Sequence, residues 1–150
     1  MPGASIGVEC SQAGVLNVSM QATLEPINVN GLSAAMVSRT LVPQMGEGSK
    51  IVNISSQIGS MVVGAKFDDL PYSTSKAVLN MVTVQLATQL KDQNITVACF
   101  HPGWVRTDMG GQSADLSPEE SAAGIVSKTD ALTLADSGQF FRWDGTVHPW

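Results

Sequence analysis

The stretch Lys50-Ile-Val-Asn-Ile-Ser-Ser56 decides the fold, because it is the first of two β-branched runs that enclose a helical segment. Residues 50–55 are predicted to form a buried strand that runs into a turn. Residues 72–92 repeat apolar side chains at helical spacing and predict an amphipathic helix. Residues 95–100 predict a second strand. This alternation is typical of a layered α/β domain with a mostly parallel sheet.

The flanking segments continue the alternation. Residues 29–45 carry small and apolar side chains at helical spacing and predict a helix. Ser117-Pro-Glu-Glu120 has the features of a helix N-terminus and predicts a helix to about Leu134. A short strand is predicted at Gln139–Arg142. The main connecting loops are residues 57–71 and 103–117.

The bulk composition indicates a single domain. The chain has 150 residues, of which 43% are apolar and 14% charged. A net charge of −5 and scattered basic residues argue against a nucleic-acid partner. Cys10 and Cys99 are too few for a disulfide scaffold, and no Cys/His spacing indicates a metal site. The chain shows no signal peptide and no apolar run long enough to span a membrane. We therefore expect a cytoplasmic protein without a membrane or nucleic-acid partner.

Tyr72 and Lys76 form the first candidate pair for chemistry. A spacing of four residues places both side chains on one face of a helix. A phenol ordinarily titrates near pH ~10, and a nearby cation lowers its pKa by favouring phenolate. Tyr72 would then be able to donate and accept a proton. Taken alone, the pair favours the simpler interpretation of a half-buried aromatic ring beside a solvated charge.

Further motifs lie in a fixed order around this pair. Asn28 lies in Ile27-Asn-Val-Asn-Gly31, two serines end the first strand, and His101-Pro-Gly-Trp-Val-Arg-Thr-Asp-Met109 follows the second strand. The order Asn, strand-Ser-Ser, Tyr-x-x-x-Lys, strand-Pro-Gly-x-Val-x-Thr resembles the short-chain dehydrogenase/reductase family. The likeness is greatest to its sniffer-like carbonyl reductase branch. It extends from about Ser11 to Trp150, including the terminal Gly-x-Phe, Asp-Gly and Pro-Trp.

The resemblance implies a catalytic set of Asn28, Ser56, Tyr72 and Lys76. Tyr72 would exchange a proton with the carbonyl or alcohol oxygen. Lys76 would lower the pKa of Tyr72 and bind the nicotinamide ribose. Ser56 would donate a hydrogen bond to the substrate oxygen. Ser55 competes for this role, and the resemblance favours the second serine.

The resemblance gives Asn28 the task of holding a water that links Lys76 to solvent. The structural alternative is a helix N-cap, which Asn30 could form equally well. His101, which ends the second strand without a spaced partner, is interpreted as a structural or rim residue.

Cofactor contacts are implied for the turn after the second strand, in addition to Tyr72 and Lys76. Pro102 and Gly103 would pass beside the nicotinamide, the Val105 backbone would hold its carboxamide, and Thr107 would add a hydrogen bond. The resemblance implies NADP as the cofactor, with NAD as the alternative, and a small-molecule carbonyl as the substrate. It also implies a homo-oligomer in which residues 32–41 and 78–90 are buried between subunits.

The first 26 residues depart from the family pattern. Family members open with a βαβαβ unit whose Gly-rich turn binds the cofactor pyrophosphate. Gly3–Gly7 faintly resembles that turn. The favoured alternative is that Ile6–Cys10 and Ser11–Gly14 correspond to the fourth strand and its turn. On either alignment we expect residues 1–150 to form one Rossmann-like parallel sheet with flanking helices, without the first βαβαβ part.

Two functions remain open. The first is NADPH-dependent carbonyl reduction or the reverse alcohol oxidation. The second is a catalytically silent relic that acts as an oligomerising interaction protein.

Overall fold

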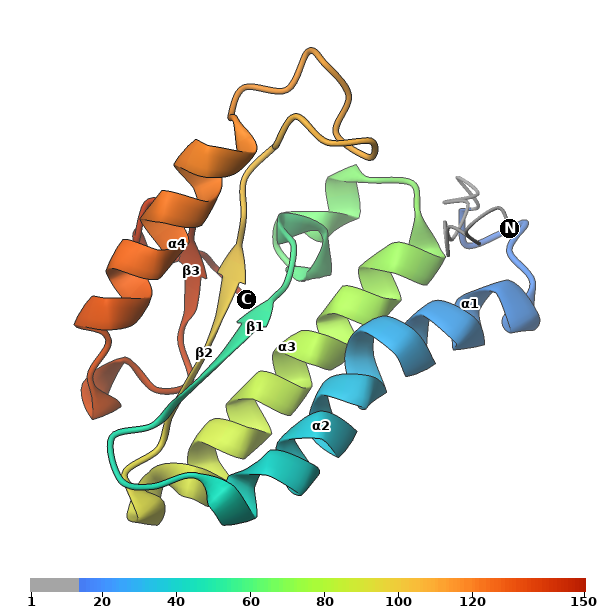
Figure 1. Cartoon of the computed structure of the whole chain (residues 1–150). Helices are drawn as coiled ribbons and strands as arrows, with labels where there is room; N and C mark the ends of the chain where they lie inside the picture. The colour runs from blue at the N-terminus through green and yellow to red at the C-terminus, as the bar shows by residue number, and fades with distance from the viewer. Residues whose placement is uncertain (1–13) are drawn as a thin grey trace, which may run out of the picture.

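A three-stranded parallel sheet lies between two layers of helices in the computed structural model, which describes residues 14–150 (Figure 1). The strands are β1 (Lys50–Ile54), β2 (Thr96–His101) and β3 (Phe140–Arg142), in the order β1-β2-β3. Lys50 is paired with Thr96, and Cys99 with Phe140. The predicted α/β class and parallel sheet are confirmed, and each predicted strand agrees to within one residue at either end.

The central strand separates two cores. The long helices on either side are α3 (Leu70–Leu90) and α4 (Pro118–Ala131). Every residue of β2 is buried. Val97 packs with Ala87 and Leu90 of α3, whereas Ala98 and Phe100 pack with Ile125 of α4. This alternation follows the two-residue period of a strand.

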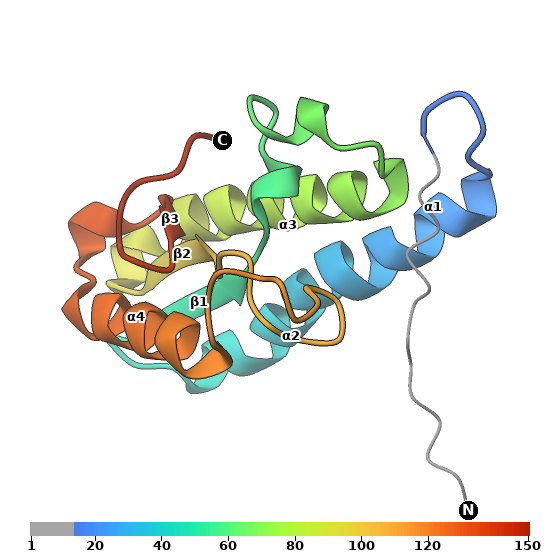
Figure 2. The same ribbon diagram turned by 90° about the horizontal axis from the view of Figure 1, so that it is seen from above.

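The two helical crossovers run over opposite faces of the sheet (Figure 2). The chain moves from β1 through α3 to β2, and then from β2 through α4 to β3, always in the same direction across the sheet. Two such crossovers on opposite faces have opposite hands. One of them is therefore left-handed, against the strong preference for right-handed connections.

The helix α3 begins at a local capping signal and carries apolar side chains on several sides. Asp69 is its N-cap and accepts a hydrogen bond from the Tyr72 N–H at 3.1 Å, and Pro71 lies in the first turn. The predicted bounds of 72–92 were correct to within two residues. The predicted amphipathic stripe was wrong: α3 buries Leu79 against the chain but leaves Met81 57% exposed on another side. Because α3 contacts both the sheet and the helical segment that precedes β1, a single apolar stripe could not cover both contacts.

A continuous helical segment precedes β1. It consists of α1 (Met20–Pro26), the π-helical turn η1 (Ile27–Leu32), α2 (Ser33–Leu41) and the 3₁₀ turn η2 (Val42–Gln44). The predicted start at residue 29 was wrong. Ser19 caps the segment by accepting a hydrogen bond from Ala22 N–H at 3.2 Å. Pro26 lacks the N–H that an α-helix needs, and the chain continues through it into the wider π turn.

The turn η1 packs closely on α3. A Cβ atom on Gly31 would lie 2.7 Å from Val78 Cγ1 and 3.1 Å from the Ser75 carbonyl oxygen. Asn30 Nδ2 donates a hydrogen bond to Ser75 Oγ at 3.2 Å. The glycine therefore allows the two helices to approach, and Asn30 fixes their relative position.

The remaining elements are short, apart from α4. They are the 3₁₀ turns η3 (Gln57–Gly59), η4 (Gly64–Lys66), η5 (Lys91–Gln93) and η6 (Leu134–Asp136). The helix N-terminus predicted at Ser117 is confirmed, and the structure adds a capping box, with Glu120 N–H donating to Ser117 Oγ and Ser117 N–H donating to the Glu120 carboxylate. The helix ends at Ala131 rather than at Leu134.

The N-terminal segments 3–7 and 6–10, which the two alternative alignments concern, lie outside the described residues. Within residues 14–150, no helix is sufficiently long and apolar to cross a membrane.

Candidate active site

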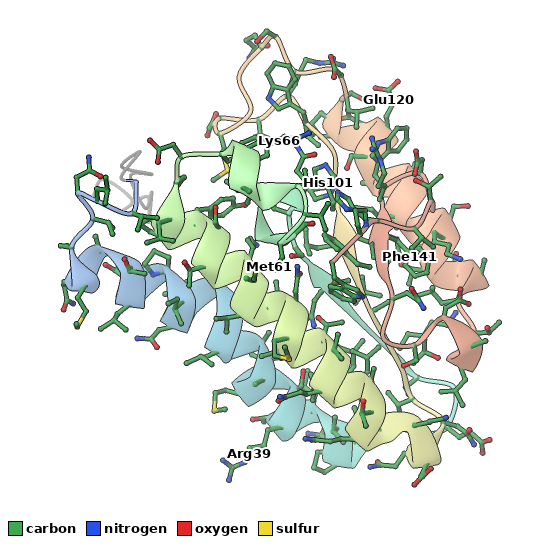
Figure 3. The ribbon with its side chains drawn as sticks, turned by 180° about the vertical axis from the view of Figure 1, so that it is seen from behind. Arg39, Met61, Lys66, His101, Glu120 and Phe141 are labelled. Carbon is green, nitrogen blue, oxygen red and sulfur yellow. The ribbon has the colours of Figure 1, made fainter. Side chains whose placement is uncertain are left out.

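The candidate residues gather at the carboxyl edge of the sheet. In a parallel sheet, the loops that follow neighbouring strands meet at this edge, which is where open α/β sheets bind ligands. Ser56 comes two residues after β1, and the turn 102–107 follows β2. Figure 3 shows His101, Lys66 and Glu120 at this end of the molecule and Arg39 at the opposite end.

Tyr72 and Lys76 lie one turn apart on the side of α3 that faces the sheet. Lys76 Nζ lies 5.6 Å from the centroid of the Tyr72 ring and donates a hydrogen bond to the Ile54 carbonyl oxygen at 3.0 Å. Burial lowers the pKa of the Lys76 ammonium, and the nearby Cys99 acts in the opposite direction. The site therefore holds a partly desolvated cation between the phenol and the strand that leads to Ser56.

The two adjacent serines have different environments. Ser55 is 2% exposed, and its hydroxyl donates a hydrogen bond to Asn80 Oδ1 at 2.5 Å. Ser56 is half-buried and caps η3, where its Oγ accepts a long hydrogen bond of 3.4 Å from the Ile58 N–H. The hydroxyl proton of Ser56 has no acceptor among the residues that the structure describes. Of the two, Ser56 has the geometry to donate to a substrate.

Asn28 lies inside the helical segment rather than at its start, so the N-cap interpretation was wrong. Its backbone carbonyl accepts the Ser33 N–H five residues ahead, which closes the π turn. Such turns occur frequently at functional sites. Its side chain is exposed and makes no hydrogen bond to Lys76 in the part of the chain described. The structure thus shows a direct contact between Lys76 and Tyr72 and a bond from Lys76 to the strand before Ser56, and no corresponding side-chain bond for Asn28 among the described residues.

The turn after β2 is held from both sides. Gly103 has φ +87°, and a Cβ atom there would lie 2.4 Å from Leu116 Cδ1. The Pro102 carbonyl accepts a hydrogen bond from Ser121 Oγ at 2.6 Å. Thr107 Oγ1 donates to the Val105 carbonyl at 3.3 Å, while the Val105 N–H donates to no described residue. The implied cofactor residues therefore form an anchored turn with an unused backbone donor.

His101 belongs to an aromatic cluster at the end of β2. Its ring lies edge-on to His148, with centroids 5.6 Å apart, and its Nδ1 accepts the Gly103 N–H at 3.4 Å. His148 stacks on Phe140 at 4.7 Å. Burial lowers the pKa of His101 to about 4, and repulsion from His148 and Arg142 contributes. His101 therefore has a structural role, as the sequence suggested.

The neutral form of His101 predicts acid sensitivity. Its unfolded pKa is near 6.5, so its contribution is complete above that value and is lost as pH falls toward 4. We expect the protonation of His101 to lower the free energy of unfolding by up to about 3 kcal/mol. Urea unfolding at pH 7, 5.5 and 4.5 should show a steeper loss in the parent than in His101→Gln. The pKa values of Glu120, Asp136 and Asp144 are also lowered, so their protonation destabilises the fold at low pH. This loss of stability is the same in both proteins and cancels in the comparison. Equal slopes would contradict the prediction.

A cavity of about 410 Å³ lies beside the site, between the loop after β1 and the first turns of α3. Its walls include Ile58, Met61, Phe67, Ser73 and Ala77. The Ser73 hydroxyl is buried and has no hydrogen-bond partner among residues 14–150. None of the proposed catalytic side chains lines this cavity, so its shape does not define the substrate.

The sequence analysis missed a group of buried polar residues behind the site. Asn80 and Thr83 lie on the same side of α3 as Tyr72, and both hydrogen-bond to β1 or to the residue after it. Their spacing of eight and eleven residues from Tyr72 places them on one helical face. This periodicity was the available signal.

Comparisons with known proteins find relatives of this sequence and of this fold. A family model described as short chain dehydrogenase matches residues 3–117. The C-signal of Myxococcus xanthus is 32% identical over 146 residues, which are 96% of this chain and 86% of that protein. The carbonyl reductase Sniffer of D. melanogaster has a TM-score of 0.85 at 32% identity, over 92% of this chain and 61% of that chain. An NADPH-bound carbonyl reductase from chicken fatty liver has a TM-score of 0.84 at 30% identity, over 94% and 62%. The chain therefore spans little more than three fifths of these two reductases.

Proposed function

Because the chain belongs to the short chain dehydrogenase family, we propose that it reduces a small-molecule carbonyl with NADPH at the carboxyl edge of its sheet. One observation carries the proposal: the Lys76 ammonium lies between the Tyr72 ring and the backbone that leads to Ser56. The choice of NADPH is supported by the reductase from chicken fatty liver, whose structure holds that cofactor.

Each residue has a definite task in this reaction. NADPH, when bound, is the source of the hydride that the carbonyl carbon accepts. Tyr72 donates its phenolic proton to the carbonyl oxygen, and Lys76 stabilises the resulting phenolate. Ser56 donates a hydrogen bond to the same oxygen, where negative charge develops. Asn28 is proposed to hold the water through which Lys76 exchanges protons with solvent.

The described residues fit one half of the cofactor. Lys76 can donate to ribose hydroxyls, and the unused Val105 N–H, with Thr107 beside it, can donate to a carboxamide. Pro102 and Gly103 place this turn next to the site. Within residues 14–150, no Gly-rich turn directly precedes a helix N-terminus, so the pyrophosphate has no cradle of the usual kind there.

The consumption of NADPH in the presence of a panel of aldehydes and ketones tests the proposal. We expect carbonyl-dependent loss of cofactor absorbance at millimolar NADPH. No turnover with any carbonyl, in a protein shown to be folded, would contradict it and favour the second candidate.

The second candidate is a catalytically inactive member of the family that acts through protein–protein contacts. It is supported by the C-signal of Myxococcus xanthus, which has nearly the same extent as this chain and whose name describes a signal. It is also supported by exposed apolar side chains along the helical segment before β1. These are Met20, Leu24, Val29, Leu32, Met36, Val37 and Leu41, each between 44% and 79% exposed.

Either function is compatible with a homo-oligomer, which we propose from this apolar surface. The second predicted segment, 78–90, contributes less, since Leu79 and Leu90 are buried within the chain and Met81 is its one exposed large apolar side chain. We expect light scattering at micromolar concentration to show a dimer or larger species. Met36→Glu should shift it to monomer, because a buried unpaired carboxylate is costly.

Ser127→Glu is the matched control, because it adds the same charge to an exposed position on α4, beyond the sheet. It should leave the oligomer intact. A monomeric parent, or dissociation by both variants, would count against the proposed surface.

A further inference from the structure

We propose that Asn80 is a positioning residue that fixes Ser56 relative to Tyr72 and Lys76. Asn80 follows these two residues on α3 at successive intervals of four, so all three lie on the side of the helix that faces β1. The inference rests on the proposed function, because it assigns Asn80 a task in placing the group that binds the substrate oxygen.

The Asn80 side chain binds a residue on each side of Ser56. Its Oδ1 accepts a hydrogen bond from Ser55 Oγ at 2.5 Å, and its Nδ2 donates to the Gly59 carbonyl at 3.1 Å. Ser55 directly precedes Ser56, and Gly59 follows three residues later. A single buried amide therefore holds both ends of the short segment that carries Ser56.

The segment between these two attachments is itself rigid. The Ser56 carbonyl accepts the Gly59 N–H at 3.0 Å, and Ser56 Oγ accepts the Ile58 N–H. A Cβ atom on Gly59 would lie 2.7 Å from the Lys76 carbonyl carbon, so this glycine lies directly against the helix. A displacement of Gly59 would consequently move Ser56 relative to Lys76.

The orientation of the Asn80 amide is determined by its neighbours. Ser55 presents a hydroxyl donor, and Cys99 Sγ lies 3.7 Å from Oδ1 as a second, weaker donor. Burial raises the pKa of Cys99 to about 12, which keeps the thiol protonated at neutral pH. The Gly59 carbonyl, by contrast, can only accept. The oxygen of the amide must therefore face β1 and β2, and its nitrogen must face the loop.

A neighbouring residue provides a control for structural effects. Thr83 Oγ1 accepts a hydrogen bond from Asn53 Nδ2 at 2.9 Å, which also ties α3 to β1. Thr83 lies on the same face and is fully buried, and its bond to the half-buried Asn53 touches neither Ser55 nor Gly59. If Asn80 merely supports the core, Asn80→Leu and Thr83→Val should have similar consequences.

Steady-state kinetics with NADPH and an accepted carbonyl distinguishes these roles. We expect Asn80→Leu to lower kcat roughly 10- to 100-fold through misplacement of Ser56. KM for the cofactor should remain within about twofold, because the cofactor contacts of Lys76 and the 102–107 turn are unchanged. Thr83→Val should retain the parental kcat. In a Ser56→Ala background, Asn80→Leu should cause little further loss, because the residue it positions is absent.

Amide hydrogen exchange supplies a readout that needs no turnover. Asn80→Leu should increase exchange at Ile58, Gly59 and Ser60, while amides in the middle of α3 stay protected; Thr83→Val should leave η3 protected. If Asn80→Leu does not fold, Asn80→Asp retains the acceptor and removes the donor to Gly59, and the same measurements apply. Unchanged η3 protection, or an equal loss of kcat in the presence and absence of Ser56, would overturn the positioning role. A parent that lacks turnover but shows the exchange pattern would contradict the proposed function and leave the positioning of Ser56 supported.

Discussion

Replacing Tyr72 with phenylalanine is expected to lower kcat/KM for carbonyl reduction by at least about 100-fold, because it removes the proton donor and keeps the ring. The ring packing and the N-cap bond from Tyr72 N–H to Asp69 are retained, so the fold should be unaffected. Initial rates of NADPH consumption measure the effect. Near-parental turnover by Tyr72→Phe would exclude Tyr72 as the proton donor.

Tyr72 is the only tyrosine in the chain, which permits an independent check. Its phenol can be titrated by carbon-13 NMR of tyrosine-labelled protein without overlap. With Lys76 Nζ 5.6 Å from the ring, Lys76→Met should move the phenol titration to higher pH. Lys76→Ala should also weaken both cofactor binding and turnover. If Lys76 acts only in packing, Lys76→Ala should change neither cofactor binding nor turnover.

NADPH is expected to bind with a Kd on the order of 1 mM, which corresponds to about −4 kcal/mol. On the proposed function, the described residues would contact only the nicotinamide half, through Lys76 and the 102–107 turn. Most of the binding surface available to a complete doubly wound fold is therefore not provided by residues 14–150.

Isothermal titration calorimetry with NADPH and NADH on the 150-residue protein measures this affinity. Thr83→Val serves as the matched control for folding. Micromolar binding would contradict the expectation and show that the phosphates are held in some other way. Absent binding would favour the interaction protein over the enzyme.

The sequence was informative wherever a local signal was strong. The β-branched runs predicted β1 and β2, the helix N-terminus signal at Ser117-Pro-Glu-Glu120 predicted the start of α4, and the ordered motifs identified the family correctly. Each of these signals depends on residues close together in the chain. The fold class followed from their order.

The errors arose where distant contacts override local preference. Pro26 suggests a helix boundary, yet the chain continues through it because the π turn η1 packs on α3 around Gly31. The difference between Ser55 and Ser56 depends on Asn80, 25 residues further along the chain. No local pattern contains that information. The roles of Asn28, Ser56, Tyr72 and Lys76 themselves stay predictions.

The parallel sheet has a consequence for the order of folding events. Lys50 pairs with Thr96 and Cys99 with Phe140, so each pair of strands closes a loop of more than 40 residues. Contacts this distant in sequence slow folding, because the entropy of loop closure is lost before the strands gain their hydrogen bonds. The helix α3, with its local Asp69 cap, can form earlier and shorten the flexible loop that must close when β1 pairs with β2. The helix that carries Tyr72 and Lys76 is thus also the element best suited to begin the assembly of the sheet.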